Sequence, residues 1–177
     1  MPSSKNMLFF SALLLTAATA SPLTARSTCN PNFEGASLTV SGYSGVPYGV
    51  VSWSANPATG APVVASTSPS KFFFQQNGDP DVTYTIKTVA NNNFAVELDG
   101  GGLVMDSVDW SGSNVNQTWK VECTTCATNI SQQRGVVASG CIISSANTDT
   151  SGFCVRATRP GRQLDLAVCS QQFDFSV

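Results

Sequence analysis

Residues 113 to 126, which read SNVNQTWKVECTTC, gather side chains that could bind a ligand. Asn116 and Gln117 carry amides that both donate and accept hydrogen bonds. Carboxylates and amides suit the recognition of sugars, because neighbouring hydroxyls donate and accept in a fixed geometry. Paired carboxylates could instead hydrolyse a glycosidic bond. Four acidic residues are concentrated shortly before this run, at Glu97, Asp99, Asp106 and Asp109.

The composition of the chain argues against most catalytic chemistry. It contains no histidine, so neither a Ser-His-Asp nor a Cys-His arrangement can form. The acidic residues alternate with apolar ones, which is typical of the solvated face of a strand. DPD at 79–81 and LDGGG at 98–102 do not have the spacing of an EF-hand loop. We therefore expect no enzymatic activity, no cofactor and no metal site.

The cysteines indicate disulfides and an oxidising compartment. Their number is six, and an even count in a secreted chain is typical of a disulfide framework. The CTTC run has the spacing of a zinc knuckle or redox pair, but the sequence has no second CxxC and no histidine. Chain order favours one bridge from Cys29 to either Cys123 or Cys126, and another from Cys141 to the remaining one. The six residues are Cys29, Cys123, Cys126, Cys141, Cys154 and Cys169.

The first 20 residues read as a secretory signal peptide. Lys5 precedes an apolar run, and Ala18-Thr19-Ala20 resembles a cleavage site. No later stretch approaches roughly 18 consecutive apolar residues, so we expect no membrane anchor. Loss of Lys5 would change the net charge from −2 to −3, which disfavours binding to nucleic acid. We expect a secreted protein and leave its oligomeric state open.

Short β-strands would have to position these side chains. Helical periodicity is nearly absent after residue 20, whereas twelve short β-branched or aromatic segments, from ASLTVSG to QQFDFSV, are bounded by turn residues. Three of these segments end in alternating apolar residues, beginning at Phe72, Trp119 and Phe173. Those three rings are expected to lie in the core.

A similar series of strands precedes each of the three endings, which indicates an internal repeat. We predict an all-β fold, a β-trefoil with three four-stranded repeats, as one domain over residues 35–177. A short N-terminal segment, 21–34, would precede it. The repeats are expected at about 35–76, 82–123 and 135–177.

Four short motifs carry a family resemblance: GAPV at 60–63, NQTW at 116–119, QLDLAVC at 163–169 and SQQF at 170–173. The sequence resembles the ricin B-chain-like β-trefoil lectins, whose repeats end in Asn-Gln-x-Trp. The resemblance covers roughly residues 35–177. The chain looks most like a secreted fungal member of that group.

The resemblance implies non-enzymatic binding of glycans or glycoproteins. Family pockets combine an acidic residue, a stacking aromatic ring and an Asn-Gln pair. In the second repeat, Glu97 matches the acid and Asp99 follows in the turn, while Asn116 and Gln117 match the amide pair. Trp110 would have to supply the ring. The first and third repeats lack the acid, so at most one usable pocket is expected.

Two sequons complicate this pocket. Asn116 begins Asn-Gln-Thr, and Asn129 begins Asn-Ile-Ser. A glycan on Asn116 would cover the expected pocket, so binding a sugar and carrying one exclude each other there. Asn129 lies in a polar stretch and is the easier acceptor.

The segment RATRPGR, from Arg156 to Arg162, concentrates positive charge. It reads as a solvated hairpin with Pro160-Gly161 at the turn, or as a basic loop that meets acidic glycans or enters a protease cleft. Cys154 and Cys169 flank it and match the intra-repeat bridge of the family, which would make the loop rigid. A protease inhibitor using this hairpin is thus an alternative function. Another is a secreted effector or structural trefoil without sugar binding.

Overall fold

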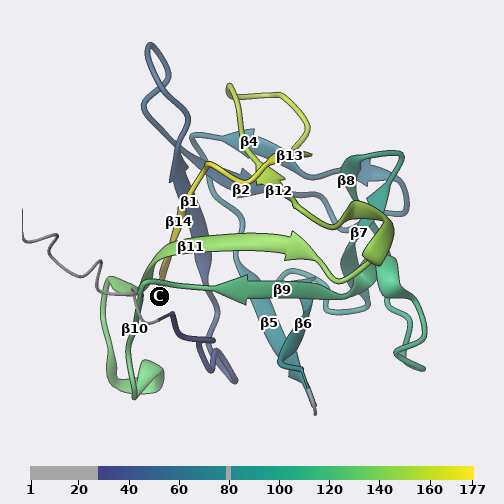
Figure 1. Cartoon of the computed structure of the whole chain (residues 1–177), viewed down its shortest axis with the longest axis horizontal. Coiled ribbons are helices and arrows are strands. Elements are labelled where there is room, and N and C mark those ends of the chain that lie inside the picture. The colour runs from purple at the N-terminus through teal and green to yellow at the C-terminus, as the bar shows by residue number, and fades with distance from the viewer. Residues whose placement is uncertain (1–27, 79–80) are drawn as a thin grey trace, which may run out of the picture.

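The computed structural model describes residues 28–78 and 81–177, so the expected leader at 1–20 lies outside the described residues. Figure 1 shows strands throughout, and the helical segments of the described ranges are single 3-10 turns. None of these is long and apolar enough to cross a membrane. The strands are β1 Thr39–Tyr43, β2 Val50–Ser54, β3 Ala61–Pro62, β4 Val64–Ser66, β5 Phe72–Asn77, β6 Thr83–Thr88, β7 Phe94–Asp99, β8 Gly102–Ser107, β9 Trp119–Glu122, β10 Thr125–Cys126, β11 Val136–Ser145, β12 Phe153–Arg156, β13 Asp165–Val168 and β14 Phe173–Ser176. The 3-10 turns are η1 Val115–Gln117, η2 Ile130–Gln132 and η3 Thr148–Thr150.

Alternation along the strands decides which face is buried. In β9, Trp119 and Val121 are buried while Lys120 and Glu122 are exposed. Such a strand buries one face and leaves the other in water, because successive side chains point to opposite faces. The predicted core positions Phe72, Trp119 and Phe173 are all buried, which confirms that part of the sequence analysis.

Seven strands close into an antiparallel barrel, in the order β6, β7, β8, β13, β12, β11 and β9. The longest of them, β11, also pairs with β10 and β14 on either side of two irregularities in its register. Strands β1, β2, β4 and β14 continue the sheet beyond the barrel, while β3 pairs with β8 and β5 with β6. The barrel therefore shares β11 with the part of the sheet that extends to β1 and β2.

The all-β prediction is confirmed, but the β-trefoil with three four-stranded repeats is wrong. The closed barrel takes β6 to β9 from the segment 82–123 and β11 to β13 from 135–177, and takes no strand from 35–76. Three equivalent repeats would contribute equally to the closed barrel. Alternating apolar residues specify the buried face of each short strand, but they do not specify which strands become neighbours.

Aromatic rings fill the core beneath the sheet. Phe175 lies against Phe33 and Phe74, with ring centroids 4.6 and 4.9 Å apart. Trp53 meets Phe72 and Phe173 edge-on. Burying each ring contributes about 2 kcal/mol or more. Because Phe33 precedes the predicted domain boundary at residue 35, the segment before β1 is part of this core.

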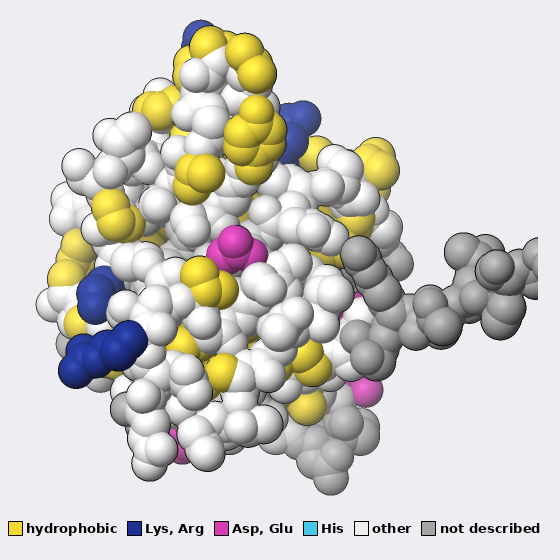
Figure 2. All heavy atoms as spheres, turned by 90° about the vertical axis from the view of Figure 1, so that its left-hand side faces the viewer, with side chains coloured by type: hydrophobic (Ala, Val, Ile, Leu, Met, Phe, Trp, Pro, Cys, Tyr) yellow, Lys and Arg dark blue, Asp and Glu magenta, His cyan; other side chains and the backbone are white. Residues whose placement is uncertain are grey.

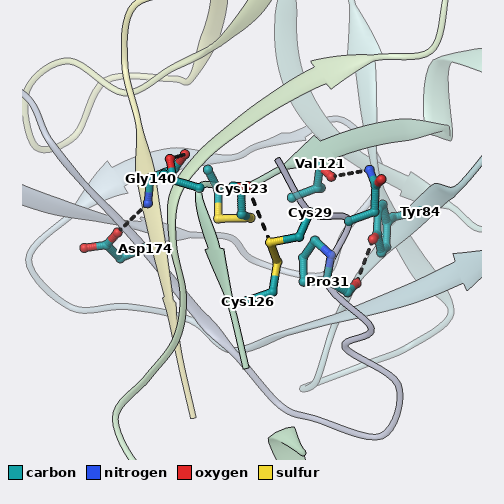
Figure 3. The surroundings of a disulfide bond; sticks show 11 residues. Cys29, Pro31, Tyr84, Val121, Cys123, Cys126, Gly140 and Asp174 are labelled. Atoms are coloured by element: carbon teal, nitrogen blue, oxygen red, sulfur yellow. Dashed lines mark hydrogen bonds between the residues drawn. A yellow bond between two sulfur atoms is a disulfide. The ribbon is translucent and has the colours of Figure 1, made fainter. Parts of the chain in front are cut away.

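Three disulfides tie the chain together: Cys29–Cys126, Cys123–Cys141 and Cys154–Cys169. The bridge expected across the hairpin and the choice favoured by chain order are both confirmed. The Cys123–Cys141 bridge joins the end of β9 to β11. Figure 3 shows the surroundings of the Cys29–Cys126 bridge, which ties the start of the described chain to β10. There the buried Tyr84 hydroxyl donates to the Pro31 carbonyl at 2.7 Å, and burial raises the pKa of Tyr84 to about 12.

Candidate functional site

Glu97 and Gln117, both expected to bind a sugar, bind each other instead. Gln117 Nε2 donates to Glu97 Oε2 at 2.8 Å and to the Ser107 carbonyl at 2.8 Å, while its Oε1 accepts from the Asp109 backbone N–H at 2.9 Å. Asn114 Nδ2 donates to the same Glu97 oxygen at 3.0 Å. Gln117 is only 4% exposed. These groups hold the segment 107–117 against β7, and Gln117 has little surface left for a ligand.

Asp109 organises the same segment from within. Its carboxylate accepts hydrogen bonds from the backbone N–H groups of Ser111 and Asn114 and from the hydroxyls of Ser111 and Ser113. The Ser111 hydroxyl, followed by the backbone donors, holds the pKa of Asp109 well below its usual range. The carboxylate therefore acts as a structural acceptor for the loop.

Asp99 and Trp110 lie apart from that network. Asp99 is exposed at the end of β7. Trp110 is 69% exposed. The Lys87 ammonium lies over its ring, 5.1 Å from the centroid, in a cation–π contact. Lys87 is otherwise buried and donates to Gln75 Oε1 at 2.6 Å, and desolvation lowers its pKa. The expected stacking ring is thus engaged by a cation from β6.

Asn116 connects the predicted site to a different part of the surface. Its Oδ1 accepts a hydrogen bond from Asn147 Nδ2 at 2.9 Å. Asn147 belongs to the β11–β12 connection, where its own Oδ1 accepts from the Asp149 backbone N–H and caps η3. The Asn116 amide of the predicted Asn-Gln pair therefore faces the β11–β12 connection.

A polar groove lies beside this connection. One hollow of about 350 Å³ is adjoined by a second of about 270 Å³, and the two share Ser144, Gly152 and Phe153. We call their union the Phe153 groove. Its remaining lining residues are Lys120, Glu122, Ile142, Ser145, Ala146, Asn147, Thr148, Thr150, Ser151, Cys154 and Cys169. The predicted residues Glu97, Asp99, Trp110, Asn116 and Gln117 are not among them.

Strand pairing explains how the groove is built. Ser144 of β11 lies opposite Lys120 of β9 and Cys154 of β12, so these positions share one face of the barrel. Gly152 has a φ of 85°, which a residue with a Cβ rarely adopts, and it redirects the chain into β12. Phe153 follows it and is 45% exposed. A ring large enough to stack on a ligand is therefore held at the border of both hollows.

The groove is suited to binding a neutral, hydroxyl-rich molecule. Its lining offers serine and threonine hydroxyls and the Asn147 amide, all of which donate or accept hydrogen bonds. Phe153 adds an apolar face. Glu122 is its one carboxylate among the lining residues, whereas glycoside hydrolysis generally uses two. The lining therefore offers a ligand several hydrogen-bonding groups and one ring on which to stack.

Sequence reasoning missed this groove, although a signal was present. Residues 144–152 read SSANTDTSG, nine residues of which only Ala146 is apolar, directly before an aromatic residue. Residues 144–146 end a predicted strand segment, and the remainder lies outside the motifs that carry the family resemblance. A hydroxyl-rich connection that ends on an exposed ring would have identified it.

The hairpin from Arg156 to Arg162 is anchored to the rest of the protein. Arg156 forms a bidentate ion pair with Asp165, with N–O distances of 2.9 and 2.7 Å. These hydrogen bonds raise the pKa of Arg156. The Ala65 backbone accepts from the Gly161 N–H and donates to the Arg162 carbonyl. The Cys154–Cys169 disulfide closes the base of the hairpin.

The sequons differ in their surroundings. Asn129 is exposed and makes no capping hydrogen bond at the start of η2. Asn116 is half-buried and bonded to Asn147. The described side chains therefore leave Asn129 the more accessible of the two amides.

Comparison with known proteins adds no relative to this description. No protein-family model matches the chain, and neither a curated protein nor a solved structure does. The resemblance to ricin B-chain-like lectins therefore rests on its sequence motifs alone.

Proposed function

We propose that the protein binds carbohydrate without catalysis, and that the sugar lies in the Phe153 groove. The observation that carries this proposal is an exposed aromatic ring beside a lining of hydroxyls and one amide. The apolar face of a sugar ring would stack on Phe153. Its hydroxyls would exchange hydrogen bonds with residues of the β11–β12 connection.

Asn116 has an indirect role in this proposal. Its hydrogen bond to Asn147 fixes one amide that lines the groove. Glu97 and Gln117 in turn hold the segment that carries Asn116. The lectin-like motif would thus position a groove residue without touching the sugar. The resemblance implies direct contacts instead.

The proposal includes secretion. Three disulfides are compatible with an extracellular protein. The amino-terminal sequence has the features of a signal peptide. A secreted protein would meet glycans and glycoproteins outside the cell, and the two sequons would make it a glycoprotein itself.

A glycan array with matched variants tests the proposal. Phe153→Ala should abolish binding of any sugar that the parent protein retains. Tyr48→Ala is the control, because Tyr48 is also 45% exposed but lies between β1 and β2. Absence of binding by the parent protein, or equal binding by Phe153→Ala, would refute the proposal.

A second candidate is protease inhibition through the hairpin Arg156–Arg162. Its support is the anchored, disulfide-closed loop that leaves Arg159 exposed. A rigid loop loses little conformational freedom when it enters a protease cleft. Arg159→Ala should then abolish inhibition in a protease panel, while Arg134→Ala, an exposed arginine elsewhere, should not. If the parent protein inhibits none of the proteases, this candidate is eliminated.

A further inference from the structure

The β1–β2 hairpin projects from the molecule and carries apolar side chains at its tip. Figure 1 shows it extending above the sheet, and Figure 2 shows the hydrophobic protrusion at the top of the adjacent face. Val46 is 89% exposed, the largest fraction among the exposed large hydrophobic residues of the described ranges. Large apolar residues exposed together indicate an interaction surface. The others of the hairpin are Tyr43, Tyr48 and Val50.

The tip has a defined conformation. Gly45 and Gly49 both have positive φ, at 87° and 66°, which allows the chain to reverse. The Ser44 N–H donates to the Gly49 carbonyl, and the Gly49 N–H donates to the Gly45 carbonyl, each at 2.8 Å. Since the loop is already ordered, binding through it would cost little conformational entropy.

Positive charge lies beside the tip. The β12–β13 loop rises on the same side of the molecule, and it carries the exposed Arg159 and Arg162. Arg156 and Tyr43 line a common hollow of about 250 Å³ at the base of the hairpin. Asp165 is neutralised by Arg156. This end is therefore cationic, although the whole chain has a net charge of −2.

We propose that this end of the protein docks on a bilayer containing anionic lipids, with the tip of the β1–β2 hairpin inserted at the level of the headgroups. Val46 and Pro47 would enter furthest. Tyr43 and Tyr48 would lie at the interface, where amphipathic rings are favoured. Arg159 and Arg162 would contact the lipid phosphates.

The order of these side chains favours a bilayer over a protein partner. Val46 and Pro47 occupy the apex, Tyr48 lies at its side, and Tyr43 and Val50 face each other at its base. The arginines are carried by the neighbouring loop. This order follows the polarity of a membrane from hydrocarbon to phosphate. Apolar insertion alone gives only marginal membrane binding, and a basic patch beside it makes the binding stable. The proposal is independent of the Phe153 groove.

Vesicle sedimentation tests the proposal with the intact, disulfide-bonded protein. The vesicles contain phosphatidylcholine alone, or phosphatidylcholine and phosphatidylserine in equal amounts. We expect binding to the mixed vesicles, weaker binding at high salt, and little binding to phosphatidylcholine alone. Val46→Asp should weaken binding about tenfold or more. Val136→Asp is the control, because Val136 is also exposed but lies at the start of β11.

A second pair of variants tests the contribution of charge. Replacing both Arg159 and Arg162 by Ala should weaken binding and reduce its dependence on salt, whereas Arg134→Ala should not. All these positions are exposed, so near-ultraviolet circular dichroism should show an unchanged fold. Failure to bind mixed vesicles would overturn the proposal and leave the hairpin for a protein partner. Equal binding by Val46→Asp and Val136→Asp, or equal binding to both vesicle types, would also overturn it.

Discussion

Gln117 donates a 2.8 Å hydrogen bond to the Glu97 carboxylate, and both residues come from the motif that suggested a sugar pocket. The same amide nitrogen also donates to the Ser107 carbonyl, and the amide oxygen accepts from the Asp109 backbone N–H. Both polar atoms of the Gln117 side chain are therefore satisfied within the protein. A residue whose type indicates recognition here performs a structural task.

Replacing Gln117 should therefore affect stability before it affects binding. Gln117→Ala leaves the Asp109 N–H and the Ser107 carbonyl without their partner, which should cost about 1 to 3 kcal/mol. Denaturant unfolding measures this loss, with the exposed Gln133→Ala as control. Unchanged stability combined with complete loss of sugar binding would show that Gln117 contacts the ligand.

The same contrast shows what the sequence could predict and what it could not. The buried faces of the strands and the core rings were predictable, because side-chain alternation determines them locally. The six cysteines indicated disulfides, but chain order left the partner of Cys29 open between Cys123 and Cys126. The barrel was not predictable, because pairing between β8 and β13 or β6 and β9 brings distant segments together. The Phe153 groove depends on the pairing of β11 with β9 and β12. Glu97 and Gln117 were both assigned to a sugar pocket, and their hydrogen bond to each other gives them a structural role instead.

Two buried tryptophans provide a matched test of side-chain hydrogen bonding. Trp119 Nε1 donates to the Val96 carbonyl at 3.0 Å, whereas Trp53 Nε1 has no partner in the described part of the chain. Both rings are 0% exposed. Trp119→Phe should therefore destabilise the protein by about 1 kcal/mol or more beyond Trp53→Phe.

Guanidinium unfolding of the two Trp→Phe variants measures this difference. Both changes remove similar apolar surface, so their common loss cancels. If the two variants are equally stable, the Trp119 hydrogen bond contributes nothing net.

Acid should weaken the loop that Asp109 organises. The folded pKa of Asp109 lies below its usual value, so its contribution to stability is fully present above the unfolded pKa of about 3.9. That contribution is lost as the pH falls through the folded pKa. Asp109→Asn should lower the melting temperature at neutral pH, and its difference from the parent should shrink below about pH 4.

Thermal unfolding across this pH range measures the effect. Asp99→Asn serves as the control, because Asp99 is an exposed carboxylate with no recorded hydrogen bond in the described ranges. A difference for Asp109→Asn that stays constant with pH would show that the native charge on Asp109 is not what stabilises the loop.

Glycan attachment should differ between the two sequons when the protein is made in a eukaryotic secretory host. Asn129 is exposed, and a glycan there would extend into solvent without disturbing a contact in the described structure. A glycan on Asn116 would stand beside Asn147 at the groove and disturb their 2.9 Å hydrogen bond. We expect glycopeptide mapping to find Asn129 occupied and Asn116 free in the fraction that binds sugar. Asn129→Gln should remove the glycan mass and leave stability and sugar binding unchanged. Sugar binding by protein fully glycosylated at Asn116 would contradict the role of Asn116 in positioning Asn147.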